Sequence, residues 1–200
     1  MKIFFLAVVV VNLSCSTNSN FSRAVGPAPS PSPGPDIPIS TGFAYPIGKG
    51  SRVTQVKDKD DWYNALEFGE TAHLGEDWNK NSSGNTDCGA AVYAASDGLI
   101  TYAQDAGPGW GNVVIIEHRL PNGDKVETLY GHLQEILKPN GTVTKREQVA
   151  KVGNASGKYL CHLHFEVRLA NCPMWNQPGP GYSNDRSGWV DPSDFIDSHR

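Results

Sequence analysis

The sequence predicts an all-β fold, in which one compact domain is built on antiparallel sheet. The 200 residues include 21 glycines, 14 prolines and few long apolar runs, so turns are frequent and a helical bundle is disfavoured. Several short segments alternate apolar and polar side chains, which is the period of a strand. An Asn-Gly pair at residues 122–123 lies between two such segments and favours a hairpin turn.

Length and charge limit the classes of function. The hydrophobic fraction of 38% is sufficient for a core, and the length allows one domain plus a leader. The formal net charge of -4 provides no basic surface for nucleic acid. We therefore expect no nucleic-acid partner.

Residues 1–15 are predicted to be a secretory signal. Lys2 gives a positive start, and residues 3–11 form an apolar run that is shorter than the roughly 20 residues needed to span a bilayer. Cys15 then resembles a bacterial lipoprotein processing site, although Asn12 stands where such sites usually carry an aliphatic residue. Two interpretations stay open: a lipidated Cys15 that anchors the protein to a membrane, or ordinary cleavage at a neighbouring small residue.

Residues 16–40 are predicted to be a disordered linker. Its run from Gly26 to Pro38 is rich in proline, which favours extended polyproline II and cannot form a packed core. At about 3.1 Å per residue this run would reach roughly 40 Å. The folded domain is expected over residues 41–200.

Within the domain, six short segments have strand character and are separated by glycine or polar turns. They are Arg52 to Val56, Ala91 to Ala94, Leu99 to Ala103, Asn112 to His118, Lys125 to Tyr130, and Val149 to Val152. We expect a type I′ turn at Asn122-Gly123 to join the fourth and fifth of these in a hairpin. Near the end of the chain, Asp191-Pro192 suits a helix N-cap followed by proline at the first helical position, which predicts a short helix from Asp191 to Ile196.

A further strand is predicted from Leu160 to Val167, and it contains candidate metal-binding side chains. Alternation along it puts His162, His164 and Glu166 on one face and the apolar residues on the other. An isolated His-x-His pair is as often a hydrogen-bonded strand residue and a solvated neighbour as it is a site. Either of these two imidazoles could reach a metal.

A second motif supplies an imidazole and a carboxylate, His73 and Asp77, four residues apart. This spacing puts both on one face of either a helix or an extended segment. Imidazole nitrogen and carboxylate oxygen suit zinc, and a catalytic zinc keeps three protein ligands and one open position. His73-x-x-x-Asp77 alone would also fit a helix surface, but together with His-x-His it predicts a zinc site.

These segments resemble the lysostaphin-type, LytM-like zinc endopeptidases that cut peptidoglycan peptides. The likeness runs from about Phe43 to Ile196 through six motifs: Phe43–Pro46, His73–Asp77, Val92–Gly98, Gly111–His118, Leu129–Leu133 and His162–Glu166. The resemblance implies a LytM-like β fold with loops that wall a zinc groove. It also implies His73, Asp77 and His164 as zinc ligands, with His132 and His162 as catalytic, non-ligand histidines.

Other polar residues receive separate predictions. Glu166 could orient a ligand from behind. His118 is expected to be structural, since the resemblance gives it no role, and His199 to be solvated. The loop from Pro173 to Trp189 is either plain surface or a groove wall, and its aromatic residues Trp175, Tyr182 and Trp189 slightly favour the groove.

Three cysteines besides Cys15 leave at least one thiol unpaired. A Cys161–Cys172 bridge is not expected, because an extended strand from Cys161 to Leu169 advances roughly 26 Å at about 3.3 Å per residue. The three residues after Leu169 cannot bring Cys172 back to within disulfide-bonding distance of Cys161. Cys88 can pair with either of the other two. Cys161 alternates away from the two histidines and is not expected to bind zinc.

We therefore expect an exported zinc endopeptidase, periplasmic or at the cell surface, that acts on peptidoglycan peptides. One alternative is a non-catalytic LytM-like module that binds or regulates another cell-wall hydrolase. Another is a secreted zinc peptidase that acts on glycine-rich proteins. Retention of all three expected ligands and both auxiliary histidines favours the enzyme over the non-catalytic module.

Overall fold

The computed structural model describes residues 36–49 and 61–200. The expected signal, Cys15, most of the linker and the expected strand from Arg52 to Val56 lie outside these ranges. Residues 35–200 form one compact unit. Within the described ranges, no helix has the length and apolar character needed to cross a membrane.

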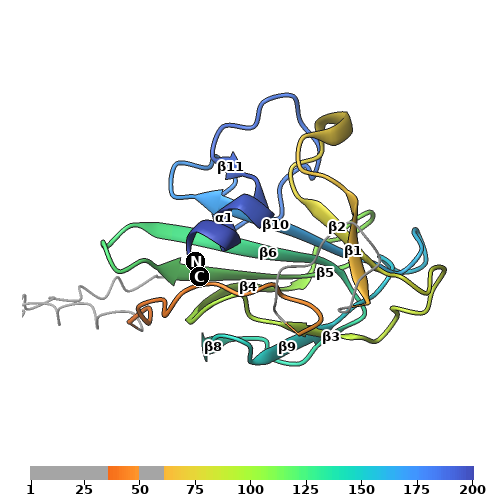
Figure 1. Cartoon of the computed structure of the whole chain (residues 1–200), viewed down its shortest axis with the longest axis horizontal. Coiled ribbons are helices and arrows are strands. Elements are labelled where there is room, and N and C mark those ends of the chain that lie inside the picture. The colour runs from red at the N-terminus through yellow and green to blue at the C-terminus, as the bar shows by residue number, and fades with distance from the viewer. Residues whose placement is uncertain (1–35, 50–60) are drawn as a thin grey trace, which may run out of the picture. The chain divides into compact units, whose positions relative to one another are not determined.

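The larger of the two antiparallel sheets in the described part of the chain organises the domain (Figure 1). Its strands follow the order β1-β2-β10-β6-β5-β4-β8, and β11 also pairs with β10. Their bounds are β1 (Trp62–Leu66), β2 (Glu76–Lys80), β4 (Gly98–Asp105), β5 (Asn112–Arg119), β6 (Lys125–Leu133), β8 (Gly141–Val143), β10 (Leu163–Leu169) and β11 (Trp189–Val190). The prediction of a β-rich, antiparallel fold is confirmed.

A smaller sheet of β3 (Ala91–Tyr93), β9 (Gln148–Lys151) and β7 (Glu135–Ile136) contributes to the same core. Val92 and Val149 from this sheet belong to one buried cluster with Ile116 and Phe165 from the large sheet. Burial of this apolar surface at roughly 25 cal/mol per Å² is the main force that holds the sheets together. In Figure 1, β3 and β9 lie along one side of β4 and β5.

Within residues 36–49 and 61–200, the two helical segments are short. The 3-10 helix η1 (Glu70–Ala72) precedes β2, and α1 (Pro192–Ser198) packs Phe195 and Ile196 into the core. The Asp191 side chain accepts a hydrogen bond from the Asp194 N–H at 2.9 Å, and proline follows at the start of the helix. The predicted N-cap and helix are confirmed, with the helix ending two residues later than expected.

The predicted hairpin between β5 and β6 is present, but the predicted type I′ turn is wrong. Gly123 has a φ of 93°, whereas Asn122 is outside the left-handed region. The turn is closed by the Gly123 N–H, which donates to the Leu120 carbonyl at 2.9 Å. Pro121 therefore takes the second position of the turn, where its fixed φ near −65° fits, and only Gly123 needs positive φ.

The other predicted strands within the described ranges are present, while β1, β2, β7, β8 and β11 are not predicted from sequence. β2 reads Glu-Asp-Trp-Asn-Lys and has no clear apolar alternation. It is a strand because it pairs with β1 on one side and β10 on the other. Such pairing is decided by tertiary contacts rather than by local propensity.

β10 separates the core from the polar side of the sheet. Leu163, Phe165 and Val167 point into the main core cluster. Alternation turns His164 and Arg168 to the opposite face, and both are buried there. The polar face of a central strand is thus covered by protein, and this is where the candidate site forms.

Candidate metal centre

Three side chains from separate segments converge beside β10. His73 Nε2 lies 3.0 Å from His164 Nδ1 and 3.3 Å from Asp77 Oδ1, and the last two atoms are 3.0 Å apart. His73 and His164 are almost fully buried, and Asp77 is partly exposed. The structure thus brings together the three residues predicted as metal ligands, and they could hold one metal ion.

Strand pairing creates this convergence. Asp77 in β2 stands opposite His164 in β10, and His73 forms an isolated bridge with Tyr182. The segment from His73 to Asp77 is therefore not helical, and it bends at Leu74 and Gly75 before β2 begins. Gly75 is required between them, because a Cβ there would lie 2.4 Å from the Phe165 carbonyl oxygen and 3.1 Å from His164 Cε1.

The distances fit a tetrahedral ion. Ligands about 2.0 to 2.1 Å from zinc are about 3.3 Å from one another in a tetrahedron, close to the 3.0 to 3.3 Å separations here. Hydrogen bonds among the three atoms would satisfy them less well than a bound metal ion would. If both imidazoles donated to Asp77, their N–H groups would oppose each other at 3.0 Å. A cation between three lone pairs removes this conflict.

The electrostatics also favour a cation. Burial alone would raise the pKa of Asp77, but hydrogen bonds from His164 and His73 hold that pKa far below its ordinary value. Burial lowers the pKa of His164, but Asp77 and Glu166 outweigh it and raise the pKa to about 9. The pocket is therefore negative enough to hold positive charge on an otherwise buried imidazole.

Glu166 lies behind His164, as the sequence suggested. Its Oε1 is 2.9 Å from His164 Nε2, and its Oε2 accepts from Trp189 Nε1 at 2.8 Å. Burial would raise the pKa of Glu166, but Arg168 and His164 keep it below its usual value. A carboxylate at Nε2 holds the proton there and leaves Nδ1 free to bind a metal.

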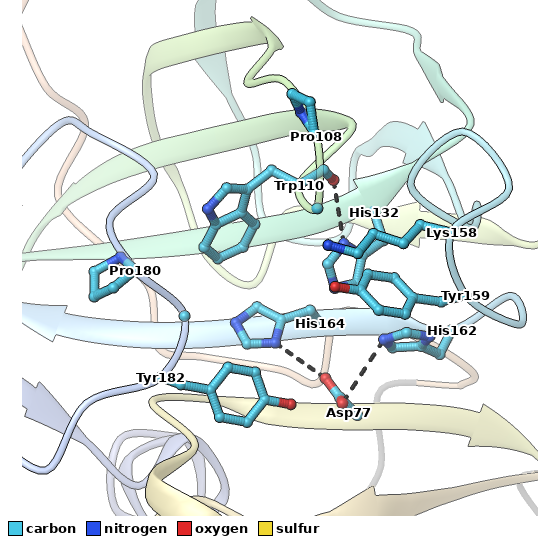
Figure 2. A pocket seen from close by; sticks show the side chains of 12 residues that line it. Asp77, Pro108, Trp110, His132, Lys158, Tyr159, His162, His164, Pro180 and Tyr182 are labelled. Atoms are coloured by element: carbon cyan, nitrogen blue, oxygen red, sulfur yellow. Dashed lines mark hydrogen bonds and ion pairs between the residues drawn. The ribbon is translucent and has the colours of Figure 1, made fainter.

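His132 and His162 stand beside Asp77 and His164 (Figure 2). His132 Nδ1 donates to the Trp110 carbonyl at 3.1 Å, and His162 Nδ1 donates to the Leu160 carbonyl at 2.8 Å. The two rings are 4.7 Å apart between centroids, and His162 Nε2 is 3.7 Å from Asp77 Oδ2. In each ring the unprotonated nitrogen, with its lone pair, is therefore Nε2.

The two auxiliary histidines differ in backbone and burial. His132 has a φ of 61°, an unusual conformation for a residue other than glycine, and it is buried. Burial, followed by the charges of His164 and His162, lowers the pKa of His132 to about 3. Its imidazole is thus neutral at physiological pH. The side chain of His162 remains partly exposed to the groove.

The remaining histidines lie elsewhere. His118 is fully buried, donates from Nδ1 to the Asp97 carbonyl at 2.8 Å and lies 2.8 Å from the Thr128 hydroxyl. His199 is exposed at the end of the chain and stacks on Phe195, with ring centroids 4.0 Å apart. Both positions agree with the structural and solvated roles expected from the sequence.

Asp77 and His164 line an open cavity of about 270 Å³ (Figure 2), whereas the fully buried His73 is not part of its lining. The lining consists of Asp77, Pro108, Gly109, Trp110, His132, Lys158, Tyr159, His162, His164, Pro180, Gly181 and Tyr182. Trp110, Lys158 and Tyr159 are not identified from the sequence. They come from loops after β4 and β9, and only the fold brings these loops to one rim.

Of the three aromatic residues suggested as a groove wall, only Tyr182 lines the cavity. Trp189 is buried in β11, where its indole N–H binds Glu166, and Trp175 lies outside the lining. The expectation for these two residues is wrong. A buried tryptophan usually has a hydrogen-bond partner for its indole N–H, and for Trp189 that partner is the Glu166 carboxylate.

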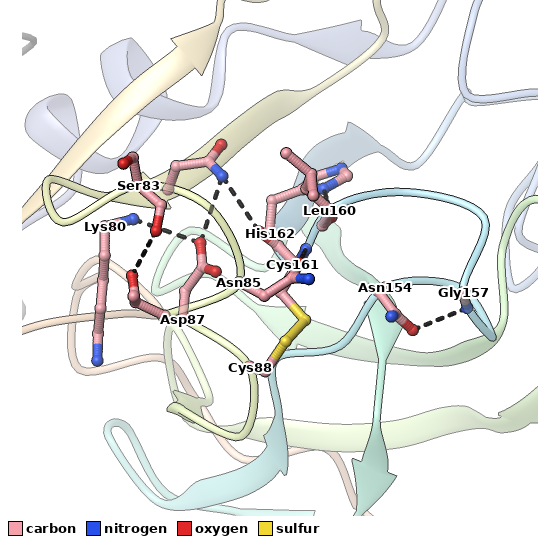
Figure 3. Close-up of a disulfide and its surroundings, with 12 residues drawn as sticks. Lys80, Ser83, Asn85, Asp87, Cys88, Asn154, Gly157, Leu160, Cys161 and His162 are labelled. Carbon is pink, nitrogen blue, oxygen red and sulfur yellow. Dashed lines mark hydrogen bonds between the residues drawn. A yellow bond between two sulfur atoms is a disulfide. The ribbon is translucent and has the colours of Figure 1, made fainter.

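A disulfide joins Cys88 to Cys161, the residue before His162 (Figure 3). The two Cα atoms are 5.2 Å apart, and Cys172 is free and buried. The Cys161 N–H also donates to Asn85 Oδ1 at 2.9 Å. This resolves the open pairing of Cys88, and the Cys161 side chain lies in the main core cluster, away from the three converging residues.

Comparison with known proteins identifies the family. The chain belongs to peptidase family M23, whose model matches residues 72–176. It is 40% identical over 86 residues to DD-carboxypeptidase/endopeptidase Mpg of Neisseria meningitidis, covering 43% of this chain and 19% of Mpg. It is 31% identical over 99 residues to the murein hydrolase activator NlpD of Escherichia coli, covering 50% of this chain and 25% of NlpD.

Among solved structures, the NMR solution structure of lysostaphin resembles this chain with a TM-score of 0.51 and 21% identity, over 68% of this chain and 51% of lysostaphin. This is a likeness of fold. The chain spans only 19% and 25% of the two curated relatives.

Proposed function

We propose that this chain is a zinc-dependent endopeptidase that hydrolyses peptide cross-links of bacterial peptidoglycan. The observation that carries the proposal is the convergence of His73 Nε2, Asp77 Oδ1 and His164 Nδ1, since Asp77 and His164 also line an open groove. Membership of peptidase family M23 supports peptide hydrolysis. The name of the relative Mpg, a carboxypeptidase and endopeptidase, supports the same class of reaction.

In this proposal His73, Asp77 and His164 hold the metal and leave one position open to the groove. When bound, zinc supplies Lewis-acid polarisation of the scissile carbonyl and makes a water in the site more acidic. Charge supports a divalent ion. The buried set of Glu127, Glu166 and Arg168 carries one net negative charge, and with Asp77 a divalent cation would bring the total to zero.

His132 and His162 would manage protons and charge around the reacting carbonyl. Because each Nδ1 donates to a backbone carbonyl, each Nε2 can accept a proton from the attacking water or, once protonated, donate to the oxyanion. Glu166 would hold the proton on His164 Nε2 and fix the orientation of the ring. The arrangement is compatible with either division of the two roles between His132 and His162.

The groove suits an extended peptide. It is open to solvent, and Trp110 and the half-exposed Tyr159 and Tyr182 provide flat apolar surfaces with polar ends. Such surfaces contact peptide backbone and short side chains without requiring one particular side chain. Peptidoglycan stem peptides are unfolded, and their backbones are accessible to a groove of this kind.

A second candidate is a non-catalytic module that activates another hydrolase. The similarity to NlpD, named a murein hydrolase activator, favours it. The retained imidazoles argue against it, because a module that only binds a partner needs neither three converging ligands nor two further basic nitrogens.

A third candidate is a peptidase that acts on glycine-rich proteins. The same groove and metal would serve this reaction, so only the substrate separates it from the main proposal. Incubation with purified sacculi and with a glycine-rich protein distinguishes all three candidates.

The test compares wild type, His162→Ala and His199→Ala on both substrates, with products identified by mass spectrometry. His199→Ala is the control, because His199 is an exposed histidine outside the site. We expect wild type and His199→Ala to cleave the peptide cross-links of sacculi at equal rates, measured as the loss of cross-linked muropeptides after the glycan is digested with a muramidase. His162→Ala should be slower by about two orders of magnitude or more, since acid–base or oxyanion assistance contributes at least about 10²-fold. Intact sacculi with a cleaved glycine-rich protein would favour the third candidate. No cleavage of either substrate by zinc-loaded wild type would contradict the peptidase proposal.

Export and anchoring belong to the same proposal. An apolar run at residues 3–11 and the following Cys15 support export, with the domain tethered by a lipid and a proline-rich linker. This location would put the groove beside its substrate in the periplasm or at the cell surface.

A further inference from the structure

Arg168 is a fully buried charged residue that no step of the proposed reaction uses. It lies on the same face of β10 as His164 and Glu166. Its Nε and one terminal nitrogen contact Glu166 Oε2 at 2.7 and 2.6 Å, and the other terminal nitrogen binds Glu127 Oε1 of β6 at 3.1 Å. One guanidinium thus joins two buried carboxylates.

The same guanidinium binds the loop that forms one wall of the groove. We call residues 174–181 the wall loop. Arg168 donates to the backbone carbonyls of Met174, Gln177 and Pro178, so its donors are shared between the carboxylates and the loop. Glu127 accepts from the Asn176 N–H at 2.9 Å. The wall loop is therefore held by hydrogen bonds to its backbone, and Met174 also packs against the buried cluster of Leu74, Cys172 and Trp189.

Arg168 and the wall loop each connect to the metal centre, through different residues. On one side the path runs from Arg168 through Glu166 to His164 Nε2. On the other side, Gly181 at the end of the wall loop accepts from the Leu74 N–H at 3.0 Å, and the adjacent Tyr182 forms the bridge with His73. Two of the three proposed metal ligands are therefore in contact with groups that also hold the wall loop.

Resting on the proposed function, we propose that Arg168 is a positioning residue that couples the wall loop to the metal centre. The loop carbonyls and Glu127 fix the guanidinium, the guanidinium fixes Glu166, and Glu166 fixes the ring of His164. Metal at His164 and order in the wall loop then stabilise each other. Zinc binding would build the substrate wall as well as the catalytic centre.

The geometry of arginine matters for this role. A guanidinium presents five N–H donors in a planar fork and can serve two carboxylates and several carbonyls at once, whereas a lysine ammonium has three donors on a flexible stem. Arg168→Lys keeps the charge and removes the fork. Glu127→Gln removes the carboxylate on the loop side without contact to His164. Arg186→Lys is the matched control, because exposed Arg186 also binds a backbone carbonyl, that of Gly69, at 3.1 Å.

Two measurements on the full chain test the coupling. Zinc affinity is obtained by competition with a chelator, and hydrogen exchange of the wall loop is followed with and without zinc, with the hairpin turn at residues 120–124 as internal reference. In wild type and Arg186→Lys, zinc should slow exchange in the wall loop but not in the reference turn. Arg168→Lys should bind zinc about 10 to 100-fold more weakly, the usual effect of disturbing groups behind a ligand. It should also lose the zinc-dependent protection of the loop.

Glu127→Gln is expected to change the same quantities in the same direction, and it tests the coupling if Arg168→Lys does not fold. The inference is overturned if folded variants bind zinc like wild type and keep the zinc-dependent protection, even if their melting temperatures fall, because that pattern is purely structural. Zinc binding without hydrolysis of any substrate would refute the proposed function alone. A wild type that binds no zinc would refute both.

Discussion

Removal of the Cys88–Cys161 disulfide should destabilise the domain strongly. The bridge closes a loop with a sequence separation of 73 residues. Loop-closure entropy for that length predicts a loss of about 4 kcal/mol in the free energy of unfolding at 25 °C. For a domain of this size the melting temperature should fall by roughly 10 °C.

The structure adds a functional consequence to this loss. Cys161 is followed by His162, and the backbone around them is held by the His162 N–H, which donates to the Gly153 carbonyl at 3.1 Å. Without the bridge, the segment from residue 85 to 88 no longer fixes Cys161 covalently, and the Nε2 of His162 becomes less well positioned. If the proposed peptidase function holds, hydrolysis should therefore decline at temperatures where the variant is still folded.

The assay is urea unfolding of wild type and Cys88→Ala/Cys161→Ala, each with and without reductant. Reductant should lower the stability of wild type toward that of the double variant and leave the double variant unchanged, since its only remaining cysteine in the described domain, Cys172, is free. Equal unfolding free energies for oxidised wild type and the double variant would refute the reasoning. A reductant effect that persists in the double variant would assign it to another group.

Three further predictions follow from the site, the core and the leader. His164→Ala should lose most bound zinc while His162→Ala retains it, as metal analysis of the purified proteins can show; the opposite pattern would exchange their roles. Burial lowers the pKa of His118 to about 4, so protonation favours the unfolded chain and stability should fall as pH drops from about 7 toward 4, by up to about 3 kcal/mol. Urea unfolding across this pH range should give a shallower slope for His118→Gln, and equal slopes would contradict the assignment. Cys15→Ala should move the protein from the detergent phase to the aqueous phase, whereas an aqueous wild type would exclude the lipid anchor.

The sequence by itself determined the β-rich class and the pattern of the central strand. Alternation along residues 160–167 was sufficient to put His164 and Glu166 on one face, because side-chain direction in a strand depends only on the period of two. The N-cap at Asp191 was equally local, since its partner lies three residues away. The resemblance added His73, Asp77 and His132 to the same neighbourhood.

Only the tertiary structure decided which groups meet. Three features depend on contacts between distant residues: the partner of Cys88, the bent, non-helical path from His73 to Asp77, and the pairing of polar β2 with β10. The turn at Pro121 was also mispredicted, because proline's fixed φ competes with the Asn-Gly preference and moves the turn by one residue.

The rim of the groove and the Arg168 network lay furthest from prediction. Trp110 and Tyr159 come from two different loops. Nothing in the sequence around Arg168 indicates that it is buried between two carboxylates. Local periodicity fixes the direction of a side chain. Its partners depend on strand order and loop closure, which arise from burial of the whole core.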